Sequence, residues 1–164
     1  MTYLLDANVF IQAKNLYYGF DFCPAFWDWL VEWNTDGKVF SIEKVYDEIH
    51  AVDDELYAWA AKRGLDLFLP PDEAMMPALK QVSTWVTGQK YEPAAVNTFL
   101  QLADYYLVAY ALAHGHIVVT HEIPSTSIRK IKIPDVCLGL GIKFMNTFEM
   151  LRRERARFVL STLP

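Results

Sequence analysis

Short apolar runs alternate with stretches of helical character along this chain. Five of them lack a regular polar alternation, and they lie at Tyr3–Leu5, Lys38–Ile42, Leu65–Leu69, His116–Thr120 and Ile142–Met145. Strands that helices cover on both faces of a parallel sheet have this pattern. The sequence therefore predicts an α/β fold of three layers, α/β/α, around a short and mainly parallel central sheet.

The stretches between these runs are predicted to be helical. The expected helices are Asn8–Tyr18, Ala25–Asn34, Glu43–Arg63, Asp72–Val86, Pro93–Gln101, Ala103–His114, Pro134–Gly139 and Thr147–Arg157. The segment Glu43–Arg63 is expected as one long helix or a broken one. Pro77 is expected to kink or restart the helix that contains it, because proline removes a helical hydrogen bond.

The chain has 164 residues, 53% of them hydrophobic, which is ample for one packed core. We expect a single domain over residues 1–164, with a basic helix and tail at about 147–164. Cys23 and Cys137 have neither the density of a disulfide scaffold nor the spacing of a zinc site. Because no signal-peptide pattern and no membrane-spanning apolar stretch is evident, we expect a soluble cytoplasmic protein without membrane contact.

The net charge of −5 hides an asymmetry along the chain. From Arg129 onward there are eight Lys and Arg against three acids, a balance of +5, whereas the preceding residues carry seven against seventeen, or −10. Nucleic-acid binding depends on lysine and arginine. An acidic body with a basic C-terminal part can hold a polyanion if divalent metals neutralise the acids.

Acidic residues stand at the ends of several of the predicted elements. Asp6 ends the first apolar run and Glu122 follows Ile117–Thr120, while Glu48 lies in the helix after the second run and Asp104 begins the helix before the fourth. A carboxylate directly after a buried strand is unfavourable unless a metal, a basic partner or a helix end satisfies it. Because ligands bind beyond the carboxyl ends of parallel strands, we expect Asp6 and Glu122 to face one crevice.

This arrangement of four acids resembles the PIN domain, a family of metal-dependent ribonucleases that includes the toxins of many toxin–antitoxin pairs. The segment Ser41–Ile49 matches the family's pattern of a strand end, a helix start and then an active-site Glu, here Glu48. Thr120-His121-Glu122 stands where the family usually has Thr-x-Asp, so its acid is one methylene longer.

The resemblance implies a catalytic set of Asp6, Glu48, Asp104 and Glu122 that binds Mg²⁺ or Mn²⁺ and cuts RNA to leave a 5′-phosphate and a 3′-hydroxyl. Carboxylate ligands favour these hard cations over zinc. Asp135 is expected as a substitute or additional metal ligand. Asn8 and Ser41 are expected to support the site by orienting ligands or water. An antitoxin protein is the expected partner, and a homodimer is a further state that the sequence leaves open.

Each of these acids also has a simpler explanation. Asp6 can cap the next helix, Asp104 and Asp135 can favour a helix dipole from the first turn, and Glu48 can belong to a solvated acidic face. The rival functions are a receiver-like phosphotransfer domain and a binding module that keeps the fold without the chemistry.

Two further segments are candidates for contacts. The apolar arc of Ala25–Asn34 is wide and places Trp27 and Val31 at its edge, so this helix either carries a protein–protein surface or is covered on both sides by the chain. The basic cluster at the C-terminus either contacts RNA phosphates or an acidic partner, or is the solvated face of the last helix, and it consists of Arg152, Arg153, Arg155 and Arg157.

Overall fold

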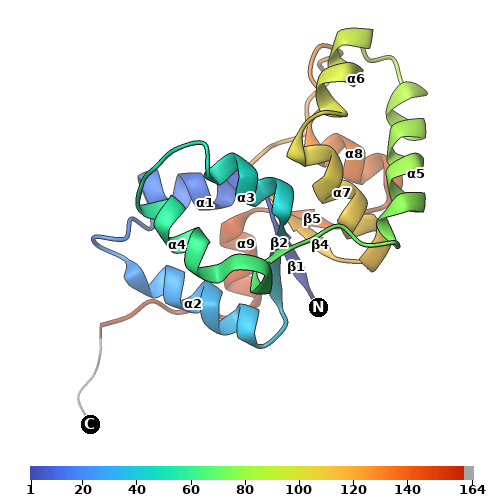
Figure 1. Cartoon of the computed structure of the whole chain (residues 1–164). Coiled ribbons are helices and arrows are strands. Elements are labelled where there is room, and N and C mark those ends of the chain that lie inside the picture. The colour runs from blue at the N-terminus through green and yellow to red at the C-terminus, as the bar shows by residue number, and fades with distance from the viewer. Residues whose placement is uncertain (161–164) are drawn as a thin grey trace.

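The computed structural model describes residues 1–160 (Figure 1). Residues 161–164, which the predicted C-terminal tail includes, lie outside the described residues. The fold is α/β, with a parallel five-stranded sheet between two layers of helices, so the predicted fold class is confirmed. No helix within the described range is long and apolar enough to cross a membrane.

The central sheet is built from very short strands. They are β1 (Tyr3–Leu5), β2 (Val39–Ile42), β3 (Phe68–Leu69), β4 (Ile117–Val119) and β5 (Phe144–Met145). Their order is β3-β2-β1-β4-β5, and all neighbours are parallel. The direction of strand addition reverses between β1 and β4, so the carboxyl ends of these strands flank the point where such sheets open a crevice.

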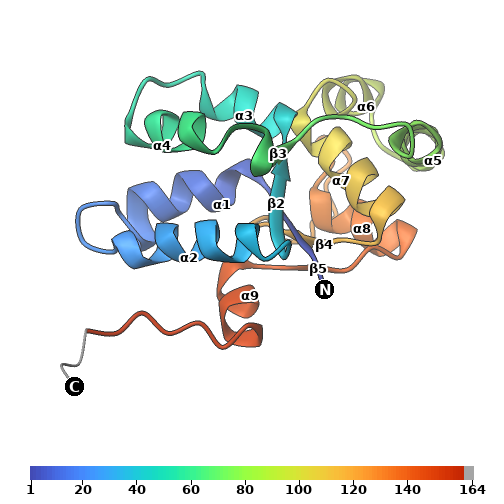
Figure 2. The same ribbon diagram turned by 60° about the horizontal axis from the view of Figure 1, so that its bottom comes forward.

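One face of the sheet carries the helices of the first half of the chain (Figure 2). These helices are α1 (Ala7–Gln12), α2 (Pro24–Thr35), α3 (Glu43–Ile49) and α4 (Glu55–Arg63). A π-helix, η1 (Ala13–Tyr17), continues α1, and a 3₁₀ turn, η2 (Gly64–Asp66), follows α4. The segment predicted as one long or broken helix is therefore broken, because Asp54 caps α4 by accepting the Tyr57 backbone N–H at 2.9 Å.

The other face carries the helices that connect β3 to β4 and β4 to β5 (Figure 2). They are α5 (Met75–Thr87), α6 (Pro93–Phe99), α7 (Ala103–His114) and α8 (Ile133–Leu140). The helix α5 begins at Met75, later than predicted. Pro77 consequently lies in the first turn, where helical N–H groups have no partner within the helix.

The helix α2 uses its wide apolar arc inside the protein. Trp27 is only 2% exposed. Its ring stacks on Phe20 with 4.1 Å between centroids, and its Nε1 donates a hydrogen bond to the Tyr18 carbonyl at 2.7 Å. Trp59 of α4 packs against it from another side. The prediction of a partner surface is therefore wrong at Trp27, where the alternative, cover by the chain itself, is confirmed; Val31 is half-buried, and a partner contact there stays a prediction.

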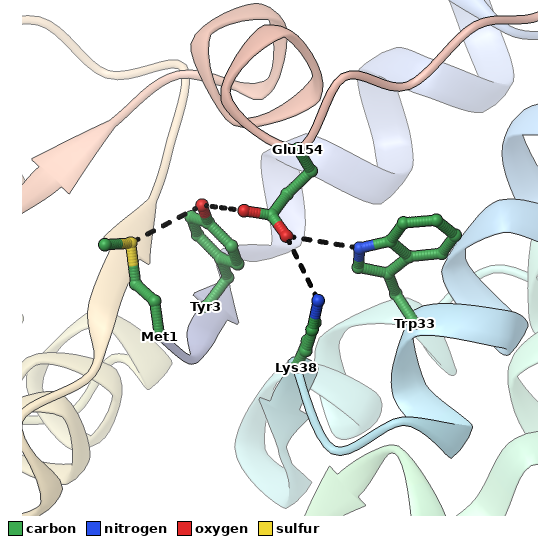
Figure 3. A network of polar contacts seen from close by, with 5 residues as sticks. All are labelled: Met1, Tyr3, Trp33, Lys38 and Glu154. Carbon is green, nitrogen blue, oxygen red and sulfur yellow. Dashed lines mark hydrogen bonds and ion pairs between the residues drawn. The ribbon is translucent and has the colours of Figure 1, made fainter.

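The last helix, α9 (Thr147–Arg153), ends four residues before the predicted Arg157. Its end is closed by a hydrogen bond from the Ala156 N–H to the Leu151 carbonyl, and Arg155 has a left-handed backbone with φ of 56°. Glu154, the residue after the helix, turns back toward the sheet (Figure 3).

The carboxylate of Glu154 ties the end of α9 to β1 and α2 (Figure 3). It accepts hydrogen bonds from the Tyr3 hydroxyl at 2.8 Å and the Trp33 indole N–H at 3.3 Å, and Lys38 Nζ lies 3.8 Å away. These partners lower the pKa of Glu154, although its burial acts in the opposite direction. The contact fixes α9 beside the sheet and so positions the segment that follows β5.

Candidate active site

Asp6 is buried at the carboxyl end of the central strand β1, with 5% of its surface exposed. Its backbone N–H donates to the Val119 carbonyl of β4 at 2.9 Å. As the N-cap of α1, it accepts the Ala7 N–H on Oδ1 at 2.7 Å, so the capping explanation describes part of its role. The other oxygen, Oδ2, accepts a hydrogen bond from the Thr120 hydroxyl at 2.8 Å.

Thr120 is the hub of a small polar network at the end of β4. Besides donating to Asp6, its Oγ1 accepts from Asn8 Nδ2 at 3.3 Å and from the Glu122 N–H at 3.1 Å. Asn8 Oδ1 in turn accepts the His121 N–H at 3.1 Å. The three residues after β4 are thus held against the start of α1. Asn8 therefore holds the backbone just before Glu122, and its predicted role in orienting ligands or water stays a prediction.

Asp104 lies in the first turn of α7, and neighbouring acids influence its ionisation. Burial, then the charges of Glu122 and Glu48, raise its pKa from 3.8 to about 7, and Lys130 acts weakly in the opposite direction. A helix N-terminus stabilises a negative charge. The raised pKa therefore means that desolvation and neighbouring carboxylates outweigh this effect.

Burial and neighbouring acids also raise the pKa of Asp6. Its pKa lies well above the usual range because of burial first, then the charge of Asp104 and, more weakly, that of Glu122, while the Thr120 hydroxyl partly offsets them. Glu48 on α3 is exposed as a residue, yet desolvation of its carboxyl raises its pKa, and the Ala103 backbone N–H opposes that change. We call Asp6, Glu48, Asp104 and Glu122 the carboxylate cluster.

Glu122 is half-buried, and its Oε1 accepts the Ile133 N–H at 3.3 Å. The extra methylene relative to Asp therefore lets it reach the first residue of α8. This carboxylate contributes to the raised pKa of both Asp6 and Asp104. It thus lies in the electrostatic neighbourhood of the cluster, although one of its oxygens already has a partner.

The spacing of the cluster is not that of a closed metal-ligand set. Over residues 1–160, no three Asp, Glu, His or Cys side chains lie close enough together to hold an ion. The chemistry of the donors nevertheless fits a hard divalent cation, because all four groups are carboxylates and the charges of neighbouring acids help to raise the pKa values of Asp6 and Asp104.

Asp135 does not take part in the charge effects that raise the pKa values of Asp6 and Asp104. Its two oxygens accept the Ser125 N–H at 3.3 and 3.1 Å, and its charge acts on Tyr91. Asp135 is not among the charges that shift the pKa of Asp6 or Asp104. Its observed contact therefore holds the loop between β4 and α8, and its predicted role as a metal ligand stays a prediction.

The remaining predicted residues lie in two places. Ser41 is completely buried and donates from Oγ to the Leu5 carbonyl at 2.6 Å, so it braces β2 against the end of β1. The basic cluster is exposed throughout: Arg152 and Arg153 form the last turn of α9, and Arg155 and Arg157 follow the helix.

Sequence reasoning missed two contributors to the site. Thr120 holds Asp6, and the signal for it was its place at the end of β4, beside the end of β1. The charge of Lys130, in the loop before α8, lowers the pKa of Asp104 against the larger effects that raise it. Nothing in its local sequence marks it, because the fold of that loop decides where it lies.

Comparison with known proteins gives a family and no individual relative. Neither the curated proteins nor the solved structures include a match to this chain. A family model described as "Domain of unknown function (DUF4411)" matches residues 3–158, and the chain therefore belongs to this family.

Proposed function

We propose that this protein is a metal-dependent endoribonuclease that hydrolyses RNA phosphodiester bonds, with a PIN-like arrangement of acids. The observation that carries the proposal is the convergence of carboxylates: Asp104 has a pKa of about 7 because burial and the charges of Glu122 and Glu48 act on it. Such perturbed groups are concentrated at functional sites. Asp6 ends β1 and Glu122 follows β4, and these two strands flank the topological switch point, where α/β sheets bind ligands.

Asp6, Glu48, Asp104 and Glu122 would hold Mg²⁺ or Mn²⁺ directly or through water, since no three of these described side chains lie close enough together to ligate one ion by themselves. A bound divalent ion supplies an activated water and charge stabilisation on the leaving oxygen. The chain's own residues orient the acids: Thr120 fixes one oxygen of Asp6, and Asn8 fixes the backbone beside Glu122. Ser41 fixes the carbonyl of the residue before Asp6. A bound cation would relieve the repulsion between neighbouring carboxylates that helps to raise the pKa values of Asp6 and Asp104.

The proposal is tested with a fluorescently labelled single-stranded RNA in the presence of Mn²⁺, Mg²⁺ or EDTA. We expect cleavage with either metal, products with 5′-phosphate and 3′-hydroxyl ends, and no cleavage in EDTA. Asp104→Asn should abolish cleavage, whereas the control Asp47→Asn, at an exposed acid of α3 outside the cluster, should not change it. Equal loss in both variants, or cleavage in EDTA, would overturn the proposal.

A second candidate is a PIN-like or receiver-like binding module that acts through protein or RNA contacts. Two observations favour this candidate. One oxygen of Glu122 already accepts the Ile133 N–H, and no three side chains of the carboxylate cluster, all of it in the described part of the chain, lie close enough together to hold an ion. This candidate predicts RNA binding that is unaffected by Mn²⁺ and no cleavage with any divalent metal.

The role as the toxin of a toxin–antitoxin pair is part of the proposal. Its support is the resemblance of the acidic motifs to the PIN family. The test is genomic and biochemical: a short neighbouring gene for a small DNA-binding protein is expected, and its product should co-purify with this chain and inhibit RNA cleavage. A neighbouring product that neither binds nor inhibits would separate the nuclease from the toxin role.

A further inference from the structure

Three aromatic rings pack together from distant parts of the sequence, and one of them belongs to the residue that precedes Glu122. The Tyr17 ring lies 4.9 Å from Phe148 in an edge arrangement and 5.6 Å from His121, and the His121 and Phe148 rings are also 5.6 Å apart. We call this group of Tyr17, His121 and Phe148 the aromatic shelf. It joins the end of η1, the loop after β4 and the start of α9.

The shelf is positioned by the same contacts that position the candidate active site. His121 directly precedes Glu122, and its backbone N–H donates to Asn8 Oδ1 at 3.1 Å. Its ring Nε2 shares a hydrogen bond of 2.9 Å with the hydroxyl of Thr147, the first residue of α9. The segment that carries Glu122 therefore also carries one ring of the shelf, and Asn8 holds its backbone.

Tyr17 is the exposed member of the shelf. It keeps 40% of its surface accessible although it contacts both other rings. It is the last residue of the π-helix η1, an uncommon conformation that is frequent at functional sites. The π-helical turn changes the direction in which Tyr17 projects, relative to an uninterrupted α-helix.

The shelf is bordered by positive charge. Arg152 follows Phe148 by one helical turn on α9, which places both on one face of the helix. Its charge also reaches Tyr18, the neighbour of Tyr17, whose pKa it lowers against the dominant effect of burial. Arg152 is exposed, as is Arg153 beside it. A polyanion that lies on the shelf would therefore meet cationic groups as well as rings.

We propose that the aromatic shelf stacks a nucleobase of single-stranded RNA, with Arg152 contacting the adjacent phosphate. This inference rests on the proposed nuclease function and names its substrate class. Exposed rings beside arginines bind unpaired bases, because every base has a stacking face and the backbone is anionic. A protein partner would use exposed aromatic residues as well, but the cationic border and the proximity to Glu122 favour RNA.

The experiment measures RNA affinity in EDTA by fluorescence anisotropy, so that cleavage does not contribute. We expect Tyr17→Ala to weaken binding of a single-stranded RNA about fivefold or more, since stacking is worth about 1 kcal/mol or more per base. Tyr17→Phe should keep the parent affinity because it retains the ring. Binding of a blunt duplex of the same sequence should not change with Tyr17→Ala, because its bases are not free to stack.

Two controls separate the shelf from general effects. Phe22→Ala removes another exposed aromatic ring, 66% accessible, and should leave RNA affinity unchanged. Tyr17→Leu keeps apolar packing on Phe148 but lacks the ring, and it should match Tyr17→Ala in affinity with a melting temperature near that of the parent protein.

The outcomes distinguish the shelf from the nuclease. Ring-dependent RNA binding without cleavage in Mn²⁺ would support the shelf and overturn the nuclease proposal. Cleavage by the parent protein with the same RNA affinity for Tyr17→Ala would keep the nuclease and overturn the shelf. A neighbouring protein partner whose binding, in place of RNA binding, depends on the Tyr17 ring would also overturn it.

Discussion

The side chains of Thr120 and Asp6 are joined across the two strands at the topological switch point, with 2.8 Å between the Thr120 hydroxyl and Asp6 Oδ2. Both residues are almost completely buried, with 2% and 5% of their surfaces exposed. A buried carboxylate needs hydrogen-bond donors to remain ionised. The pair therefore joins the ends of β1 and β4, and the Thr120 hydroxyl lowers the pKa of Asp6 against the larger effects of burial and of the Asp104 charge, which raise it.

Thr120→Val should destabilise the protein by about 1 to 2 kcal/mol. The substitution keeps the shape of the side chain, but it leaves Asp6 Oδ2 without its donor and removes the acceptor of Asn8 and of the Glu122 N–H. Thr120→Ser retains the hydroxyl and is the matched control. The free energies of unfolding come from urea titrations, and equal values for the two variants would show that the hydroxyl has no such role.

The stability of the parent protein should fall as the pH rises from about 4 to about 7. The Asp104 carboxyl holds its proton up to about pH 7 in the folded protein but loses it near 3.8 when unfolded. The folded state therefore binds more protons in this window, and raising the pH removes stability. Asp6, whose pKa is also raised, contributes in the same direction.

Asp104→Asn should flatten this pH dependence in part and make the protein more stable than the parent above pH 7. Moving a pKa from 3.8 to about 7 corresponds to at most about 4 kcal/mol. Solvent screening reduces the expected gain to about 1 to 2 kcal/mol. Urea titrations at pH 5 and pH 8 measure it. Parallel profiles for parent and variant would mean that Asp104 ionises as an ordinary surface acid.

The short apolar runs predicted the fold well because burial on both faces leaves a distinct pattern. All five strands fall within the predicted runs, since β1 and β4 consist of residues that only a covered sheet can accommodate. Helix ends were less predictable. Glu154, directly after α9, accepts hydrogen bonds from Tyr3 and Trp33, which are more than a hundred residues away in the sequence. The end of α9 therefore depends on contacts that its local sequence does not reveal.

The candidate site was predictable in its acids and not in what surrounds them. Asp6 and Glu122 follow strands whose ends must meet, so their proximity follows from topology. Lys130 has no sequence signal of its own, and Thr120 is marked only by its place at the end of β4, beside the end of β1. Trp27 could not be placed from the sequence. Its position at the edge of an apolar arc was compatible with a surface or with burial, and it is buried because Phe20, in the loop after η1, stacks on its ring.

Glu154→Ala should destabilise the protein by about 1 to 3 kcal/mol. The carboxylate is the acceptor for the Tyr3 hydroxyl and the Trp33 indole N–H, so its removal leaves partly buried donors without a partner (Figure 3). Glu149→Ala, at an exposed acid of the same helix, is the control and should cost only a few tenths of a kcal/mol. Thermal unfolding measures both, and the prediction fails if the two variants melt together.

The same carboxylate should make the parent protein lose stability in acid. The pKa of Glu154 is lowered from 4.5 in the folded state, so its contribution is present above about pH 4.5 and disappears as the pH falls through the folded pKa. The difference in the free energy of unfolding between parent and Glu154→Ala should therefore shrink below pH 4. An unchanged difference at pH 3 would assign the loss to packing instead of charge.

Mn²⁺ should raise the melting temperature of the parent protein, because an ion bound to the carboxylate cluster of the folded state stabilises it by mass action. At a hundredfold excess over Kd the gain is about 2.7 kcal/mol, which corresponds to about 5 to 10 °C for a chain of this size. Beyond saturation of the site, the increase should grow with the logarithm of the metal concentration. Mg²⁺ should act in the same direction.

Asp104→Asn should reduce this increment, since a neutral amide is a poorer ligand for a hard cation than a carboxylate. Asp47→Asn, outside the cluster, should keep the full increment and controls for metal binding elsewhere on the acidic surface. Because Asp104→Asn is expected to be the more stable protein without metal, the two effects have opposite signs and cannot be confused. A parent protein whose melting temperature is the same with and without millimolar Mn²⁺ would remove the metal from the proposed function, and with it the nuclease.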